Sequence, residues 1–340
     1  MAGRFFHAPL IEGVEGLRLA AVATSREVEV AERHPQTRVR AVAADVINAD
    51  GVDLVVVATP NHTHYDLARE ALLAGRHVVV DKPFTVTAEE AETLSELARS
   101  RGLFLSVFHN RRWDGDFLTL RQLIADGSLG EIVFFESRFD RHRPDPKPGA
   151  WREGAEPGAG VLYDLGPHLI DQALALFGLP TRVHAEVRRE RSFGGADDAF
   201  DLCFSYPSLL VRLGASMLAR ESTPRFLVRG TRATWIKQGF DVQESALRSG
   251  PVQRDAAWGA EKPERWGTLI SDDGSSRVET LHGNYFAYYE NVRDAIQKKA
   301  PPAVTAGDAI AVMRLLEQAW GRGNPDTGSP SVHRAPRARA

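Results

Sequence analysis

The first hundred residues alternate between short apolar runs and stretches with helical spacing. Apolar runs without polar alternation, typical of strands buried on both faces, occupy residues 17–24, 52–58, 77–80 and 103–108, and residues 37–42 add a shorter strand. Repeated strand–helix–strand units of this length predict a parallel, doubly wound sheet.

Two of the intervening helices have recognisable starts. Asn61 follows the strand at 52–58 and is expected to cap a helix that ends at Gly75. Thr87 and Glu90 have the spacing of a capping box, which predicts a helix from residue 88 to about Gly102.

The pattern changes after about residue 125. Longer runs with alternating polar positions predict an antiparallel sheet with one face toward solvent, and they cover residues 130–140, 181–191, 200–206, 209–218 and 225–238. Helical spacing interrupts this pattern at 158–177 and closes the chain at 285–298 and 306–320.

Composition and charge narrow the class of protein. The chain has 340 residues, which predicts two domains, with 43% hydrophobic and 26% charged residues and a net charge of -3. These values argue against a nucleic-acid or membrane-surface partner. With no signal-peptide core and no apolar stretch of about 20 residues, the sequence predicts a cytoplasmic protein. Cys203 is the only cysteine, and the histidines lack the spacing of a metal site.

The strand at 77–80 ends in Asp81-Lys82-Pro83, a candidate for chemistry. Open α/β sheets place their ligands at the carboxyl ends of the strands, where the Lys82 ammonium could stabilise a substrate oxygen that gains negative charge. A solvated lysine in an ordinary strand-to-helix turn is the alternative, and this motif alone favours it.

Asp164 and His168 form a second candidate within the helix at 158–177. Residues four apart lie on one helix face, so the carboxylate could orient the imidazole as a general base. A helix cap by Asp164 with a structural His168 is the alternative. Combined with Lys82, the pair suits removal of a proton from an alcohol.

These motifs resemble those of the Gfo/Idh/MocA oxidoreductases, and within that family the NADP-dependent scyllo-inositol dehydrogenases. The resemblance spans nearly the whole chain and rests on the motifs at residues 6–10, 59–61, 80–84, 108–113, 151–152 and 163–168. It implies hydride transfer between nicotinamide and a ring alcohol of a polyol or sugar, with scyllo-inositol as a candidate substrate.

The resemblance also assigns roles to residues. It implies that His168 is the general base, that Asp164 orients it and that Lys82 binds the reacting oxygen. Residues implied at the cofactor, besides Lys82, are Gly3, Thr59, Pro60, Asn61, His64, Asp81, Trp151 and Arg152. Arg111, Arg112 and Tyr285 are weaker candidates for the pocket wall, with surface or packing roles as the alternative.

The end of the strand at 17–24 bears on the choice of cofactor. NAD enzymes usually place an acidic residue there to bind the ribose 2′-hydroxyl. This chain has Ser25 and Arg26, whose hydroxyl and guanidinium suit a 2′-phosphate, although Glu27 follows directly. The sequence therefore predicts NADP rather than NAD.

The chain departs from the family pattern at its beginning. Family members begin with a strand and a G-x-G-x-x-[GA] turn, of which only Gly3 has a counterpart here. An upstream start of translation and a decayed or repurposed copy both account for this, and the intact downstream motifs favour the first. The chain as given is expected to bind its cofactor weakly.

The predicted fold is thus α/β followed by α+β. An N-terminally truncated Rossmann-type parallel sheet occupies 1–115, an open, mainly antiparallel sheet with helices on one face occupies 116–328, and 329–340 form a disordered tail. The resemblance implies a homo-oligomer, a dimer or tetramer. A cofactor-binding regulator without turnover, built on the same fold, is the alternative function.

Overall fold

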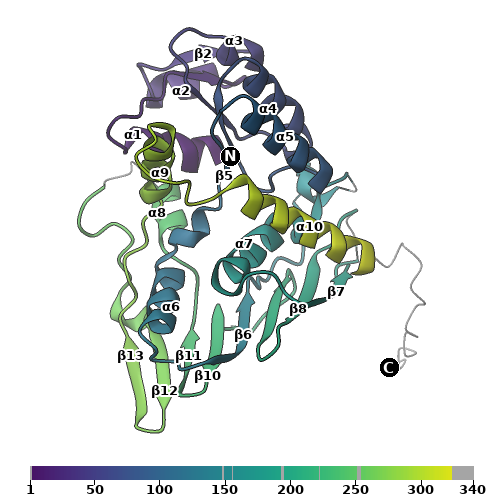
Figure 1. Ribbon diagram of the computed structural model, residues 1–340, viewed down its shortest axis with the longest axis vertical. Helices are drawn as coiled ribbons and strands as arrows, with labels where there is room; N and C mark the ends of the chain where they lie inside the picture. The colour runs from purple at the N-terminus through teal and green to yellow at the C-terminus, as the bar shows by residue number, and fades with distance from the viewer. Residues whose placement is uncertain are drawn as a thin grey trace.

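A computed structural model describes residues 2–147, 149–154, 156–192, 195–221, 223–250 and 254–323. It shows a smaller region with parallel strands above one large sheet (Figure 1). The predicted tail at 329–340 lies outside the described residues.

The parallel strands form two separate sheets. β1 (Ala21–Ala23) pairs with β2 (Arg38–Arg40), and β4 (His77–Val80) lies between β3 (Leu54–Val57) and β5 (Leu105–Val107). No strand in the described part of the chain joins β1 to β3, which agrees with the predicted gap in the sheet. The helices between these strands are α2 (Glu27–Arg33), α3 (Ala43–Ile47), α4 (His64–Leu73) and α5 (Ala88–Ser100).

The two predicted helix starts have different outcomes. The capping box is confirmed, because Thr87 Oγ1 accepts from Glu90 N at 3.2 Å and Glu90 Oε2 accepts from Thr87 N at 3.2 Å. The predicted cap by Asn61 is wrong. Asn61 begins a short 3-10 helix (Asn61–Thr63), and its amide instead donates to Gly158 O at 2.6 Å.

The first and last parts of the chain share a hydrophobic core. A π-helical turn (Gly3–His7) continues into α1 (Ala8–Glu12), and α9 (Phe286–Ile296) packs beside them. Leu10, Val79, Phe108 and Tyr289 belong to one buried cluster. The parallel strands are therefore supported by residues from both ends of the sequence.

The large sheet has the strand order β13-β12-β11-β10-β6-β9-β8-β7. All its pairs are antiparallel except β6–β9, so the predicted, mainly antiparallel sheet is confirmed. Its strands are β6 (Ile132–Arg138), β7 (Arg182–Arg188), β8 (Ala199–Ser205), β9 (Leu210–Ser216), β10 (Phe226–Gly230), β11 (Ala233–Lys237), β12 (Gly267–Ser271) and β13 (Gly274–Val278). The sequence pattern missed β12, whose residues are mostly half-buried, and β13, whose residues are mostly exposed.

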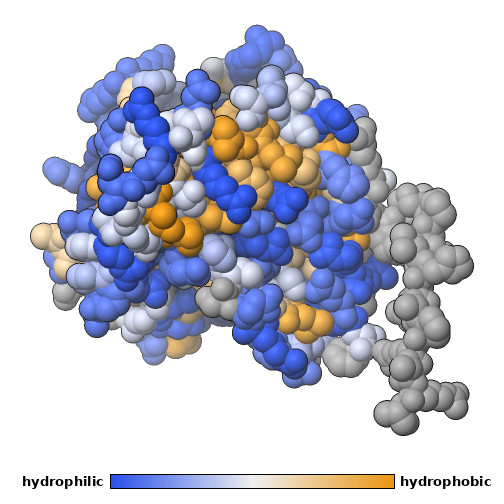
Figure 2. All heavy atoms as spheres, turned by 90° about the horizontal axis from the view of Figure 1, so that it is seen from below, coloured by the Kyte–Doolittle hydropathy of each residue, from blue (hydrophilic) through white to orange (hydrophobic). Residues whose placement is uncertain are grey.

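Helices cover one face of this sheet, as Figure 1 shows for α6 (Gly115–Ala125), α7 (Gly160–Phe177) and α10 (Ala306–Gly323). Alternate residues such as Phe135 and Val228 are buried beneath them. The remaining short helices are α8 (Gln243–Ser249), η3 (Asn110–Trp113), η4 (Trp151–Glu153) and η5 (Pro263–Arg265). Seen from below, the surface is mostly polar around a central group of hydrophobic residues (Figure 2).

Candidate active site

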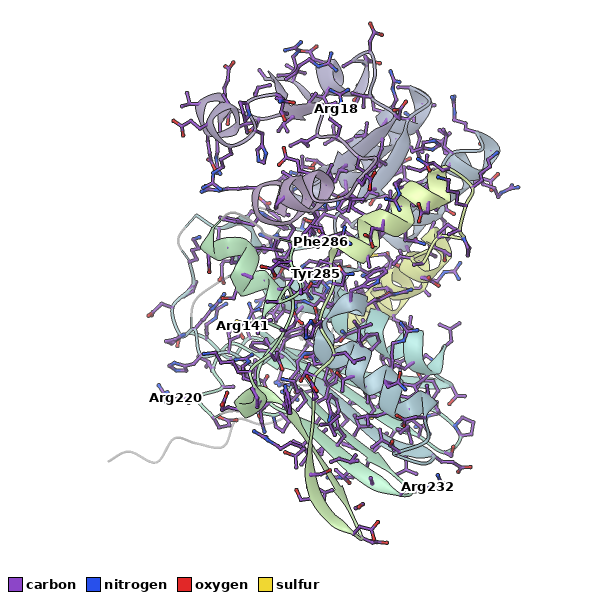
Figure 3. All side chains as sticks on the ribbon, turned by 90° about the vertical axis from the view of Figure 1, so that its left-hand side faces the viewer. Arg18, Arg141, Arg220, Arg232, Tyr285 and Phe286 are labelled. Atoms are coloured by element: carbon purple, nitrogen blue, oxygen red, sulfur yellow. The ribbon has the colours of Figure 1, made fainter. Side chains whose placement is uncertain are left out.

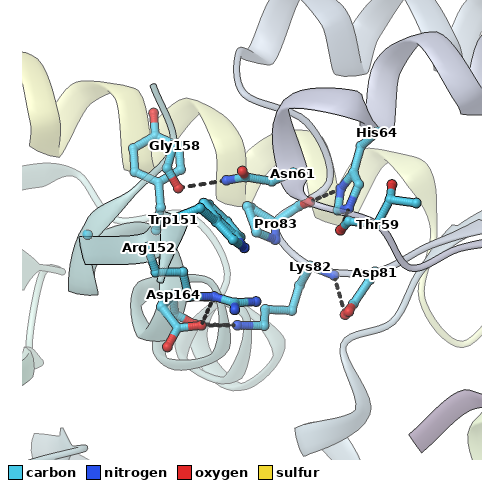
Figure 4. A pocket seen from close by; sticks show the side chains of 12 residues that line it. Thr59, Asn61, His64, Asp81, Lys82, Pro83, Trp151, Arg152, Gly158 and Asp164 are labelled. Atoms are coloured by element: carbon cyan, nitrogen blue, oxygen red, sulfur yellow. Dashed lines mark hydrogen bonds and ion pairs between the residues drawn. The ribbon is translucent and has the colours of Figure 1, made fainter. Parts of the chain in front are cut away.

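Lys82 leaves the end of β4 and crosses to helix α7. Its ammonium donates to Asp164 Oδ1 at 2.9 Å and to the Asp164 carbonyl at 2.5 Å, and Arg152 Nε lies 3.3 Å from the same Oδ1 (Figure 4). Burial favours the neutral acid, but Lys82 and Arg152 outweigh it and hold the pKa of Asp164 well below its usual value. Asp164 is therefore a carboxylate that fixes the position of Lys82.

Asp81 stabilises the turn from the other side. Its Oδ1 accepts from Lys82 N at 2.7 Å, and His7 Nε2 lies 3.9 Å from Oδ2. Burial opposes ionisation, yet His7 and Lys82 lower the pKa of Asp81 below its usual value. The Asp81 carboxylate is therefore charged and lies against the turn that carries Lys82.

Three segments meet around this lysine. His64 on α4 has Nδ1 2.9 Å from Pro83 O and Nε2 3.0 Å from Thr59 O, so it links the turns that follow β3 and β4. Asn61 binds the backbone of Gly158, where a Cβ would lie 2.4 Å from the Asn61 amide nitrogen. The close approach and the φ of +78° both explain the glycine.

A pocket forms where these segments meet (Figure 4). Most of the residues that the sequence assigned to the cofactor line it, namely Thr59, Asn61, His64, Asp81, Lys82, Trp151 and Arg152, together with Asp164. Pro60 belongs to the same turn as Thr59 and Asn61.

Gly3, Ser25 and Arg26 do not line this pocket. Ser25 and Arg26 are exposed directly after β1, and Arg4, next to Gly3, pairs with Glu29 at 2.5 Å. The Arg26 guanidinium, whose side chain is 66% exposed, lies 4.0 Å from the same carboxylate. These residues form a second, more open patch at the end of the other parallel sheet.

His168 lies one helical turn after Asp164 and is 6% exposed. Burial, with Lys82 and Arg111 nearby, lowers the pKa of His168 well below its ordinary value, so the imidazole is neutral at pH 7. Its Nδ1 has no hydrogen-bond partner among the described residues. The expectation that Asp164 orients His168 is wrong in this geometry, because the carboxylate binds Lys82 and Arg152 instead.

An aromatic wall that the sequence did not reveal lies beside His168. Phe139 is 6.4 Å from the imidazole between ring centres and stacks on Phe240 at 5.2 Å. The buried Arg225 has its guanidinium carbon 4.1 Å from the Phe139 ring, and Arg111 has its own at 4.9 Å. These residues come from segments far apart in the chain, so no local spacing could reveal their contact.

Arg111, one of the three weaker candidates, reaches this wall. Its guanidinium also contacts Asp114 at 3.3 Å and Glu244 at 2.7 Å. Burial lowers and the surrounding acidic groups raise the pKa of Arg111, with a net rise, so it stays charged. It is thus both a structural ion-pair partner and part of the wall beside His168.

Arg112 and Tyr285 have packing roles. Arg112 makes a bidentate contact with Asp171 at 2.9 and 2.7 Å. Tyr285 is fully buried, and its hydroxyl donates to Asp114 at 2.6 Å. Neither residue lines the pocket around Lys82.

Neither a metal-binding cluster nor a membrane-spanning helix occurs in the part of the chain that the structure describes. No group of three or more histidine, cysteine or acidic side chains is placed to hold a metal ion there. Within the same residues, no helix is long and apolar enough to cross a bilayer.

The fold and the pocket define an oxidoreductase with a dinucleotide-binding, Rossmann-type region. Residues 1–109 match the model of the oxidoreductase family with an NAD-binding Rossmann fold, and residues 117–236 match that of the GFO/IDH/MocA C-terminal domain. The chain belongs to the Gfo/Idh/MocA family of oxidoreductases, which confirms the resemblance.

Individual relatives support the same assignment. The uncharacterized oxidoreductase YdgJ of Escherichia coli is 46% identical over 93% of this chain and 92% of its own. The scyllo-inositol 2-dehydrogenase (NADP(+)) IolW of Bacillus subtilis is 38% identical over 94% of this chain and 90% of its own. The solved structure of the oxidoreductase yvaA from Bacillus subtilis has a TM-score of 0.92 at 37% identity, covering 96% of this chain and 94% of its own.

Proposed function

We propose that this protein transfers a hydride between NADP and a CH–OH group of a polyol or sugar. The arrangement of Lys82 carries the proposal. Two of the three ammonium hydrogens are bound by Asp164, which leaves the third for a substrate oxygen. The fixed cation stands at the carboxyl end of a parallel strand, where such folds bind their ligands.

His168 and Lys82 have complementary roles in this proposal. The neutral imidazole can accept the hydroxyl proton, because its pKa is too low for it to be protonated at pH 7. The Lys82 ammonium stabilises the negative charge that develops on the same oxygen. Asp164 acts through Lys82 by holding it in place.

The pocket residues fit a nicotinamide cofactor. Thr59, Asn61 and Trp151 lie around the space next to Lys82, where bound nicotinamide would supply the hydride acceptor. Ser25 and Arg26 lie at the end of β1, with the guanidinium largely exposed and able to meet a 2′-phosphate. The preference for NADP agrees with the name of the scyllo-inositol relative, which includes NADP(+).

A substrate panel tests this function. The purified chain, NADP or NAD, and a set of inositols and aldoses are followed by the absorbance of the reduced cofactor. Turnover that His168→Ala abolishes is the expected result. The alternative, a cofactor-binding regulator, predicts cofactor binding by fluorescence without turnover of any substrate.

We also infer a homo-oligomer that uses the helix-free face of the large sheet. Ile270 on β12 is 43% exposed, and it lies on that face because its neighbour Leu269 pairs with the buried Trp235. Light scattering after size exclusion is expected to give a dimer or tetramer. A monomer at micromolar concentration would exclude this assembly.

A further inference from the structure

Arg141 lies next to the candidate active site, and its guanidinium has no acidic partner among the described residues. It follows β6, and its backbone N–H donates to Ser216 O at 2.9 Å. Its guanidinium carbon lies 6.0 Å from the Phe240 ring, which stacks on Phe139 beside His168. Arg141 therefore lies on the aromatic wall that leads to the imidazole.

The acidic groups near Arg141 are already bound to other cations. Asp164 holds Lys82 and Arg152, and Glu244 holds Arg111 at 2.7 Å. Glu244 also binds Arg248 at 2.9 Å.

The acid that precedes Arg141 in the sequence is engaged as well. Asp140 contacts Arg138 at 2.6 Å and accepts from Thr223 at 2.9 Å. Arg141 has no hydrogen bond or ion pair from its side chain within the described residues, and neither does its neighbour Arg143. Arg141 is thus a positive charge at the wall that no acidic side chain of the described residues pairs with.

An unpaired, half-buried positive charge lowers the stability of the site when no ligand is bound. Arg141 is half-buried, and burial together with Arg143 lowers the pKa of its guanidinium. A guanidinium offers a planar fork of donors that matches the oxygens of a carboxylate or phosphate. An anion bound at this point would supply the missing partner.

We propose that the substrate of this enzyme is an anionic polyol or sugar whose carboxylate or phosphate is bound by Arg141, with Arg143 adding positive charge. This inference rests on the proposed dehydrogenase function and refines its substrate class. The reacting hydroxyl lies at Lys82 and His168, and the anionic group lies farther along the aromatic wall. A neutral inositol would leave Arg141 without its partner.

Three sugars that differ only at one carbon test the inference. At C6, D-glucose is neutral, D-glucuronate has a carboxylate, and D-glucose 6-phosphate has a phosphate. The last two compounds show which of the two anionic groups Arg141 prefers. Scyllo-inositol is included as a neutral ring. We expect kcat/KM for one of the anions to exceed that for D-glucose and scyllo-inositol by about tenfold or more, the effect of a charge-assisted hydrogen bond.

Variants show whether Arg141 causes the preference. Arg141→Gln is expected to raise KM for the preferred anion by about ten- to one-hundredfold with a smaller change in kcat, and Arg141→Lys to retain part of the preference. Arg232→Gln is the matched control. Arg232 lies near the far end of the large sheet, well away from Arg141 (Figure 3), and its side chain is exposed and donates to Gly127 O at 3.3 Å.

Other outcomes separate this inference from the proposed function. Equal or better turnover of the neutral compounds, or a preference that survives Arg141→Gln, overturns the anionic substrate while the dehydrogenase function stands. If no compound is turned over, the proposed function fails. Thermal stability with and without each compound then tests whether Arg141 binds an anion. Stabilisation by glucuronate or glucose 6-phosphate in the wild type but not in Arg141→Gln supports the anion site; equal stabilisation, or none, overturns it.

Discussion

The cofactor side and the substrate side of the site are built in different ways. On the cofactor side, turns that follow two neighbouring strands are held by backbone contacts, as when His64 bridges the carbonyls of Thr59 and Pro83. Lys82 and Asp81 have partners within the same small set of segments. Positions here are set by these turns together with contacts from Asn61 to Gly158 and from Lys82 to Asp164.

The substrate side depends on long side chains from distant segments. Arg111 and Arg225 lie over the ring of Phe139, and Arg141 faces Phe240 with no acidic partner in the part of the chain that the structure describes. The described polar groups around Lys82 are therefore paired with one another, whereas Arg141 on the substrate side is available for the proposed anion. This difference suggests that the choice of substrate is encoded in the arginine-rich wall, while Lys82 and His168 supply the chemistry.

The largest effect is expected at the residue where the two sides meet. His168→Gln removes the general base and should reduce kcat by about 10²- to 10⁴-fold, with little change in the affinity for NADPH. Steady-state kinetics and a fluorescence titration measure the two quantities. His184→Gln is the matched control, since that histidine is on β7 and 73% exposed.

The pH profile gives a second measurement on the same residue. Because burial and nearby cations lower the pKa of His168, the base stays deprotonated as the pH falls to 6.5, its ordinary value. We expect kcat/KM to be constant from pH 8 to about 6.5 and to fall only in more acidic solution. A decline centred near pH 6.5 would show that the imidazole is not buried as described.

Lys82 tests whether the cofactor side also carries catalytic charge. Lys82→Met removes the stabilising cation and should lower kcat by about 10²- to 10³-fold. Arg152→Met removes the other partner of Asp164. Because the Arg152 side chain is 47% exposed and lies farther from Oδ1 than Lys82 does, we expect kcat to fall by about tenfold or less. Similar losses from both would mean that their common role is only to neutralise Asp164.

Local motifs predicted the cofactor side well. Three consecutive valines before Lys82 form the buried β4, and the Thr87–Glu90 capping box starts α5 as expected. Asn61 was misread because its tertiary contact with Gly158 replaced a helix cap. The sequence near Asn61 describes only an isolated segment, and a distant carbonyl that accepts from the Asn61 amide can hold the side chain away from the capping position.

The substrate side was much less predictable. Helical spacing correctly placed Asp164 and His168 on α7, but it could not show that Lys82 and Arg152 bind the carboxylate. Phe139 directly follows β6 and Arg225 directly precedes β10, so the two residues meet only because these strands pair in the folded sheet. No periodicity along the chain contains that information.

Cofactor choice tests the open patch after β1. Arg26→Asp replaces the exposed guanidinium with a carboxylate, which should repel a 2′-phosphate and raise KM for NADP by about tenfold while leaving KM for NAD nearly unchanged. Arg33→Asp at the end of α2 serves as the control for the charge change. A wild-type preference for NAD, or an equal effect on both cofactors, would contradict the assignment.

The smallest effect concerns the start of α7, the helix that carries both Asp164 and His168. Asp197 Oδ2 accepts from Leu162 N at 2.7 Å, while Oδ1 has no partner among the described residues. Burial raises the pKa of Asp197 to about 7, and the hydrogen bond from Leu162 only partly offsets this.

The sign of the pH dependence follows from that shift. Because the pKa of Asp197 is higher in the folded than in the unfolded chain, its contribution to the free energy of unfolding is fully present below about pH 4. That contribution is lost as the pH rises through 7. Asp197→Asn keeps an acceptor for Leu162 N but has no charge to bury. Relative to the wild type, the variant should therefore gain roughly 1–3 kcal/mol of unfolding free energy between pH 5 and pH 8, measured by urea denaturation. If Asp197→Asn is instead less stable than the wild type at pH 8, the helix N-terminus stabilises the carboxylate more than burial destabilises it.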